Sequence, residues 1–166
     1  MTGETADDAD VLAVRANALI AGLGKSDGND PATGLSAAEL AGCVMRTLAL
    51  PEIFALRPEL VPEITVYAAN EVEGGEQATF GIADALTIDP DGRPAIIVDW
   101  KSDVSPDTYI LEHYRAQVRA YLEVTGAKQG LIVLMTTGQV LSVAPSDVTP
   151  VSVSYTHLTL PTKRIV

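Results

Sequence analysis

The chain has 166 residues, 47% of them hydrophobic, and its 22 acidic and 11 basic side chains give a formal net charge of −11. This length suits one domain with its own core, and the apolar fraction is too high for a disordered chain. No apolar run approaches the ~20 residues that span a bilayer, and the acidic start is unlike a secretory signal, so we expect a cytoplasmic protein without a membrane segment.

Two helices are expected in the first third of the chain. The first begins after Asp10 as N-cap and stops at Gly24, because apolar residues recur there at helical spacing, at Val11, Val14, Ala18 and Leu19. The segment Lys25–Gly34 is a loop by composition. The second helix starts at Ser36, which has Glu39 three residues later as in a capping box, and ends before Pro51. A short helical turn is expected at 52–56.

The rest of the chain alternates between strand and helix patterns. Asp91–Gly92 marks a hairpin turn, and a long amphipathic helix begins at Pro106 and ends at Gly126. Strands are expected on either side of these signals, at 63–69, 79–88, 95–101, 131–135 and 140–143. The order of two helices, three strands, one helix and two strands predicts the α/β class, with a mixed β-sheet flanked by helices.

The segment Ala95–Lys101 places charged side chains at the end of a buried strand. Alternation along a strand puts Asp99 and Lys101 on one face and Trp100 on the other. Ionised groups at such a position are costly to desolvate unless they are paired or bind a metal ion. Asp99 and Lys101 are therefore candidate site residues.

A second carboxylate, Asp84, precedes this strand in the expected hairpin. A hairpin that turns at Asp91–Gly92 brings Asp84 close to Asp99. Two adjacent carboxylates repel unless a cation lies between them. Their oxygen atoms suit magnesium or manganese. A metal ion and a neighbouring lysine, Lys101, are the parts that phosphodiester hydrolysis needs, since the negative charge that develops on the phosphate must be stabilised.

In this arrangement the sequence resembles the PD-(D/E)XK nuclease superfamily, and within it the RecB-like nuclease domain at the C-terminus of UvrD-type helicase–nucleases. The resemblance extends from about residue 63 to residue 135. The positions that carry it are Glu63, Gly81 with Asp84, Asp99–Trp100–Lys101, and Gln117 with Tyr121 on the long helix.

The resemblance implies a restriction-endonuclease-like core and a Mg²⁺- or Mn²⁺-dependent DNA exonuclease that acts with a helicase in double-strand-break repair. Asp84 and Asp99 would be metal ligands, helped by the backbone carbonyl of Trp100, and Lys101 would be the catalytic lysine. Three further residues would support the site: Glu63, Gln117 and Tyr121.

The resemblance also suggests how the chain is organised. Residues 1–34 would be an N-terminal helix and linker that continue from a helicase part, and residues 35–153 would be the nuclease domain.

Residues 154–166 depart from the preceding composition and resemble translated sequencing-adapter read-through, so we expect a non-native tail and exclude it from the site.

Two departures leave an alternative open. Many relatives carry a metal-binding histidine on the first helix, where this chain has none, and the acidic charge is opposite to that of most proteins that grip DNA. The alternative is a catalytically inactive nuclease-fold module that binds DNA or has a structural role. A third possibility, a stand-alone nuclease of the CRISPR-associated type, is ranked last, because Cys43 is the only cysteine and a cysteine-held iron–sulfur cluster is excluded.

Overall fold

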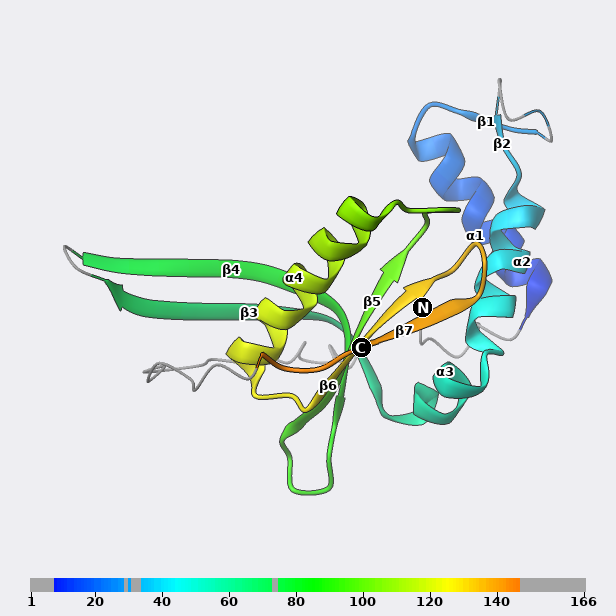
Figure 1. Ribbon diagram of the computed structural model, residues 1–166. Coiled ribbons are helices and arrows are strands. Elements are labelled where there is room, and N and C mark those ends of the chain that lie inside the picture. The colour runs from blue at the N-terminus through cyan, green and yellow to red at the C-terminus, as the bar shows by residue number, and fades with distance from the viewer. Residues whose placement is uncertain (1–7, 29, 31–33, 73–74, 147–166) are drawn as a thin grey trace, which may run out of the picture.

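Figure 1 shows the computed structural model, which describes residues 8–28, 30, 34–72 and 75–146. The tail expected to be non-native, 154–166, lies outside these residues. The helices are α1 (Ala9–Gly22), α2 (Ala37–Leu48), α3 (Pro51–Leu56), the 3₁₀ helix η1 (Arg57–Glu59) and α4 (Thr108–Thr125). The strands are β1 (Ser26–Asp27), β2 (Gly34–Leu35), β3 (Leu60–Val72), β4 (Gly75–Ile88), β5 (Pro94–Lys101), β6 (Gln129–Leu134) and β7 (Gln139–Val143).

The main sheet has five strands in the order β3-β4-β5-β6-β7. β5 and β6 are parallel and are connected through α4, whereas the other neighbours are antiparallel. The expected α/β class with a mixed sheet flanked by helices is therefore confirmed. The expectation of a plain loop at Lys25–Gly34 is wrong at its two ends, because β1 and β2 form a short parallel pair there.

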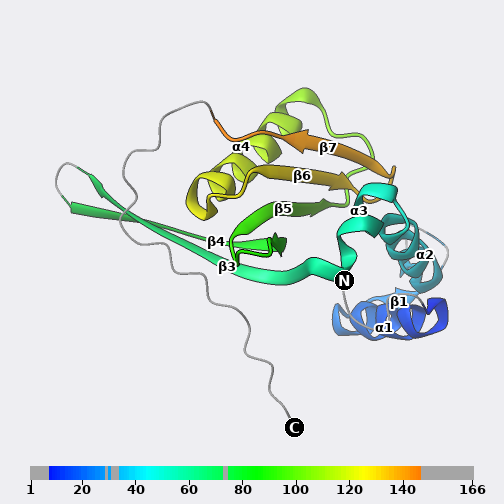
Figure 2. The ribbon, with the colours of Figure 1, turned by 90° about the horizontal axis from the view of Figure 1, so that it is seen from below.

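Helices cover both faces of the sheet. Figure 2 shows α4 along one face and α1, α2 and α3 gathered near the end where β5 and β6 finish. The core under α4 includes Ile97, Val118 and Ile132, and the core on the opposite face includes Leu48, Ile53 and Val98. Gly130 lies directly against Val118, so a side chain at residue 130 would push α4 away from β6. Among the described helices, none has both the length and the apolar character needed to cross a bilayer.

The first helix differs from its expected form. Its N-cap is Asp8 rather than Asp10, and the Asp8 carboxylate accepts hydrogen bonds from the next turn. The predicted apolar face is wrong: Val14 is 71% exposed, while Ala16 and Ile20 are buried against Ala37 of α2. Ala16 and Ala37 are small and Ile20 packs beside them, so this contact with α2 decides which face of α1 is buried.

The other helix ends agree with the sequence signals. Ser36 caps α2 by accepting a hydrogen bond from the backbone N–H of Glu39 at 3.2 Å, as the capping-box pattern predicts. α4 begins slightly later than expected, with Asp107 as its N-cap, and ends at Gly126, whose φ is 72°. α4 is therefore fixed at both ends, and it carries several of the candidate site residues.

The β3–β4 hairpin is longer than predicted and extends beyond the rest of the sheet (Figure 1). Only the inner part of β4 pairs with β5, from the Ala85–Val98 pair to the Ile88–Pro94 pair. Beyond Ala85 the two strands separate, and they form a fork that opens toward α4.

Candidate active site

The fork between β4 and β5 holds Asp84. This residue is one position beyond the last ladder pair, Ala85–Val98, so that it is level with Asp99 across the two strands. Its Oδ2 accepts a hydrogen bond from the backbone N–H of Trp100 at 2.8 Å. If β4 and β5 stayed paired here, a backbone carbonyl of β4 would accept this hydrogen bond instead. The side chain of Asp84 therefore replaces the missing strand pairing and is fixed against β5.

Asp99 is a buried carboxylate that forms an ion pair with Lys101. It is 3% exposed, and its Oδ2 lies 2.8 Å from Nζ of Lys101. Within the described residues this oxygen receives no hydrogen bond of good geometry, so its contact with Lys101 is an ion pair without a well-directed hydrogen bond. Burial raises the pKa of Asp99 above 3.8; Lys101 lowers it, and the negative charge of Asp84 raises it further.

Lys101 is held from three sides. Besides its ion pair with Asp99, its Nζ donates a hydrogen bond to Oε1 of Gln117 at 3.1 Å. The same nitrogen lies 4.7 Å from the centre of the Tyr114 ring, a distance suited to a cation–π contact. The Lys101 side chain is only 17% exposed, so this ammonium group is directed into the fork and not into open solvent.

Tyr121 connects α4 to β4. Its hydroxyl donates a hydrogen bond to the backbone carbonyl of Ile82 at 3.1 Å and accepts one from Nε2 of Gln117 at 3.4 Å. The ring lies over Gly81, where a Cβ would be 2.8 Å from Cε1 of Tyr121. The parts of the sequence pattern on β4, β5 and α4 therefore lie together, and hydrogen bonds or packing contacts link them.

Two residues of this cluster were missed by the sequence analysis. Tyr114 and Asp103 are joined by a hydrogen bond of 2.6 Å from the tyrosine hydroxyl to Oδ2 of Asp103. This bond is the main cause that raises the pKa of Tyr114 to about 12. The available signal was spacing: Tyr114 precedes Gln117 by three residues and Tyr121 by seven, which places all three on one face of a helix.

Glu63 is in line with the two aspartates but is separate from their contacts. The register of β3 and β4 pairs Pro62 with Ala85 and Ile64 with Ala83, so Glu63 lies opposite Asp84. The glutamate is exposed, and within the described residues it has no hydrogen bond or ion pair to Asp84 or Asp99. Its φ of 53° is in the left-handed region, an unfavourable conformation for a residue other than glycine.

The side chains of Trp100, His113 and Cys43 lie outside this cluster. The side chain of Trp100 packs in the core on the face away from α4, and His113 is exposed on α4. Cys43 is half-buried on α2 and its thiol contacts the carbonyl of Met135 at 3.4 Å. Among the described residues, no three His, Cys, Asp or Glu side chains gather into a metal-binding group, so Asp84 and Asp99 are a pair of carboxylates and not a complete ligand set.

Comparison with known proteins gives no family. No protein-family model matches the chain, and no curated protein matches it significantly. Among solved structures the chain is similar to one described as "Crystal structure of SSO0001", with a TM-score of 0.46 and 19% sequence identity. The alignment covers 81% of this chain and 63% of that one, which is less than two thirds of its length. At this level of similarity the neighbour has no bearing on the site.

Proposed function

We propose that this chain is a divalent-cation-dependent DNA nuclease domain with a restriction-endonuclease-like core. The observation that supports the proposal is the fork between β4 and β5. There Asp84, Asp99 and Lys101 meet at the end of a buried strand, in contact with a polar face of α4. Buried acid–base groups with a shifted pKa at a rigid strand end are typical of catalytic sites.

The residues present fit a divalent metal ion. Asp99 Oδ2 is buried without a hydrogen bond of good geometry, and burial, with a smaller contribution from repulsion by the charge of Asp84, disfavours its ionised form. A cation would relieve this repulsion, and carboxylate and carbonyl oxygens suit Mg²⁺ or Mn²⁺. Asp84 and Asp99, with the backbone carbonyl of Trp100, would hold it. When bound, such an ion polarises the phosphate and helps to generate the nucleophile near neutral pH.

Lys101 is the residue best placed to act on the substrate. Its ammonium group lies beside Asp99, so it can orient a water molecule there or offset the negative charge that develops on a phosphate. The Gln117 amide and the Tyr114 ring restrict the position of this ammonium group. Tyr121 hydrogen-bonds to Gln117 and to the backbone of β4. It is therefore a positioning residue, which acts on the site through Gln117 and Lys101 and through the position of β4.

The charge of the chain bears on its partners. A net charge of −11 gives weak electrostatic attraction to DNA over most of the surface. A helicase domain or subunit that delivers DNA ends to the site would compensate for this deficit, as would cations bound at the carboxylates. Together with the resemblance of the sequence to helicase–nucleases, this deficit supports a proposed role as an exonuclease module within a helicase–nuclease of double-strand-break repair.

A second candidate function, an inert nuclease-fold module, is favoured by the Asp99–Lys101 ion pair. The two charges offset each other without a metal ion, and the described residues supply only two clustered carboxylates. Calorimetric titration with Mn²⁺ discriminates the two candidates. The enzyme should bind Mn²⁺ with a signal that Asp84→Asn and Asp99→Asn abolish, whereas the inert module should give no such signal.

Cleavage of end-labelled DNA in Mn²⁺ tests the proposed activity itself. We expect the wild-type chain to release labelled fragments and Lys101→Ala to release none. The activity is rejected if the wild-type chain, fused to a helicase partner that delivers DNA ends, leaves the label intact.

A further inference from the structure

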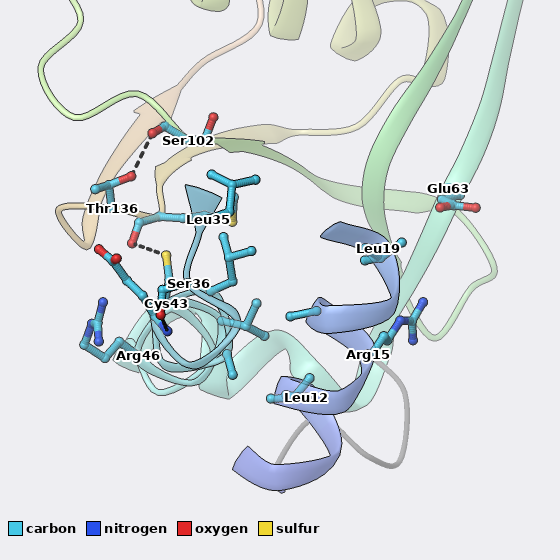
Figure 3. A pocket seen from close by; sticks show the side chains of 16 residues that line it. Leu12, Arg15, Leu19, Leu35, Ser36, Cys43, Arg46, Glu63, Ser102 and Thr136 are labelled. Carbon is cyan, nitrogen blue, oxygen red and sulfur yellow. Dashed lines mark hydrogen bonds between the residues drawn. The ribbon is translucent and has the colours of Figure 1, made fainter. Parts of the chain in front are cut away.

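A pocket of about 670 Å³ lies between α1, α2 and the ends of β5 and β6, and nothing in the proposed chemistry uses it. Figure 3 shows this pocket with α1 on one side and α2 on the other. Its volume is within the range of roughly 300–1,000 Å³ that small-molecule sites occupy. Its lining is mostly apolar and includes Leu12 and Leu19 of α1 and Leu40 of α2. These leucines give it the apolar walls that suit a planar ring.

Two residues join the pocket to the candidate active site. Ser102 lines the pocket and directly follows Lys101, and Glu63 lines it from the position opposite Asp84. In Figure 3 both lie on the side of the pocket that faces the sheet. The left-handed φ of Glu63 is at this same junction, and strained residues of this kind gather at functional sites. Glu63, Asp84 and Asp99 lie level with one another on neighbouring strands, and the pocket therefore adjoins this line of carboxylates at Glu63.

Hydrogen bonds fix the wall that α2 shares with the sheet. The Thr136 hydroxyl donates to the backbone carbonyl of Ser102 at 2.7 Å, and Thr47 and Cys43 both contact the carbonyl of Met135 at 3.4 Å. These bonds connect the end of β5, the turn after β6 and one face of α2. This side of the pocket is thus built into the fold.

Two arginines stand on opposite sides of the pocket, Arg15 on α1 and Arg46 on α2 (Figure 3). Both are exposed, and neither has an ion pair or hydrogen bond within the described residues. Glu39 and Glu63 also line the pocket, so local recognition would come from the arginines and not from an excess of positive charge. A planar guanidinium group binds a phosphate with two parallel hydrogen bonds.

We infer that this pocket binds the nucleotides next to the scissile bond at the end of a DNA single strand. The leucine walls hold a base, and Arg15 and Arg46 bind the phosphates on either side of it. This inference rests on the proposed nuclease function, because the shared edge at Glu63 and Ser102 places the bound strand beside the catalytic fork. It also gives an acidic chain a local means of holding a polyanion.

The test measures binding and cleavage separately. The affinity of a fluorescent single-stranded DNA oligonucleotide is measured by anisotropy in calcium, with a gel to show that the oligonucleotide stays intact. The variants are Arg15→Ala/Arg46→Ala, the charge-preserving Arg15→Lys/Arg46→Lys, and Arg93→Ala as a matched control. Arg93 is exposed at the turn between β4 and β5, away from the pocket lining. Circular dichroism confirms that each variant is folded.

We expect the double alanine variant to bind at least about tenfold more weakly than the wild-type chain. The slope of log K against log salt should also become shallower by about 0.7 for each phosphate that the variant no longer binds. The lysine variant should keep the slope, and Arg93→Ala should keep both quantities. Leu19→Asp, at a position 64% exposed in the fold, should weaken binding without unfolding the chain.

Equal affinity of the wild-type chain and the double alanine variant would overturn the inference, as would an absence of wild-type binding at low salt. Tighter binding of a matched RNA would overturn the assignment to DNA. Cleavage in Mn²⁺ is scored on the same proteins. A chain that binds through its arginines but cleaves nothing, even when it is fused to a helicase partner, supports a strand-binding pocket and rejects the nuclease. A chain whose cleavage and affinity are both independent of the arginines rejects the pocket alone.

Discussion

The ring of Tyr121 occupies the space that a side chain at Gly81 would need. A Cβ at residue 81 would lie 2.8 Å from Cε1 and 3.0 Å from the hydroxyl oxygen of the tyrosine. The glycine on β4 and the tyrosine on α4 are distant in sequence, yet their contact determines how closely α4 approaches the fork. Because Gln117 and Lys101 are positioned through this approach, the two residues help to set the geometry of the candidate site.

Gly81→Ala should therefore destabilise the fold. The new methyl group must displace the Tyr121 ring and strain its hydrogen bond to Ile82, and overpacking of this kind costs about 1–3 kcal/mol. Urea unfolding measures the loss. Gly22→Ala is the matched control, because nothing lies within 4 Å of a Cβ there and it should leave stability unchanged or slightly increased. A Gly81→Ala variant as stable as the wild-type chain would contradict the contact.

Asp99→Asn should change how stability depends on pH. Burial raises the folded-state pKa of Asp99 above its unfolded value of 3.8, so the folded state keeps this proton to higher pH than the unfolded chain does. The contribution of Asp99 to the free energy of unfolding is thus most favourable below pH 3.8 and falls as the pH rises through the folded-state pKa. The asparagine variant lacks this fall.

Urea midpoints in EDTA, from about pH 4 to about pH 7, test the prediction for Asp99. The stability of Asp99→Asn relative to the wild-type chain should increase with pH across this window. Asp91→Asn, at an exposed turn position, should follow the wild-type curve. Parallel curves for Asp99→Asn and the wild-type chain would show that the folded-state pKa of Asp99 is not raised.

Tyr114 should position Lys101 through its ring. Tyr114→Phe keeps the ring under the ammonium group, whereas Tyr114→Leu removes a contact worth about 0.5–1 kcal/mol. In NMR spectra the ε-methylene protons of Lys101 should be shifted upfield by the ring in the wild-type and phenylalanine proteins and should return toward ordinary values in the leucine variant. An unchanged shift in the leucine variant would show that the ring does not face Lys101 in solution.

The hydroxyl of Tyr114 should ionise at unusually high pH. Its hydrogen bond to Asp103 raises the pKa of the phenol to about 12, from 10.0 for a free tyrosine. Asp103→Asn removes the negative charge, so the pKa should move back toward 10.0. Ultraviolet difference titration, with Tyr114→Phe to identify this phenol among the others, measures the change. Identical titrations of the wild-type and Asp103→Asn proteins would refute the assignment.

Much of the candidate site could be predicted from the sequence, because it depends on local rules. The buried strand before Asp99 and the Asp91–Gly92 turn bring Asp84 level with Asp99 by hairpin geometry alone. Strand alternation correctly placed Asp99 and Lys101 on one face, which is turned toward α4 in the fold, and Trp100 on the other.

What the sequence could not predict depends on how the elements pack together. The position of α1 against α2 decides that Ala16 is buried and Val14 is exposed. The sequence of α1 does not show this, because the helix has apolar residues on all of its faces. The support that Tyr114 gives to Lys101 depends on how α4 lies across the fork. The left-handed backbone of Glu63 also follows no local signal, and this residue lines the pocket rather than contacting Asp99.

The most direct test of the central claim compares manganese-dependent cleavage of end-labelled single- and double-stranded DNA by five proteins. These are the wild-type chain, Asp99→Asn, Lys101→Ala, and the matched controls Asp91→Asn and Lys128→Ala, whose charged groups are exposed. A nuclease centred on Asp99 and Lys101 should be active in the wild-type and control proteins and should lose at least about a hundredfold in rate in the other two. Equal cleavage by all five proteins would show that the activity does not come from this site, and no cleavage even with a fused helicase partner would show that the chain is not a nuclease.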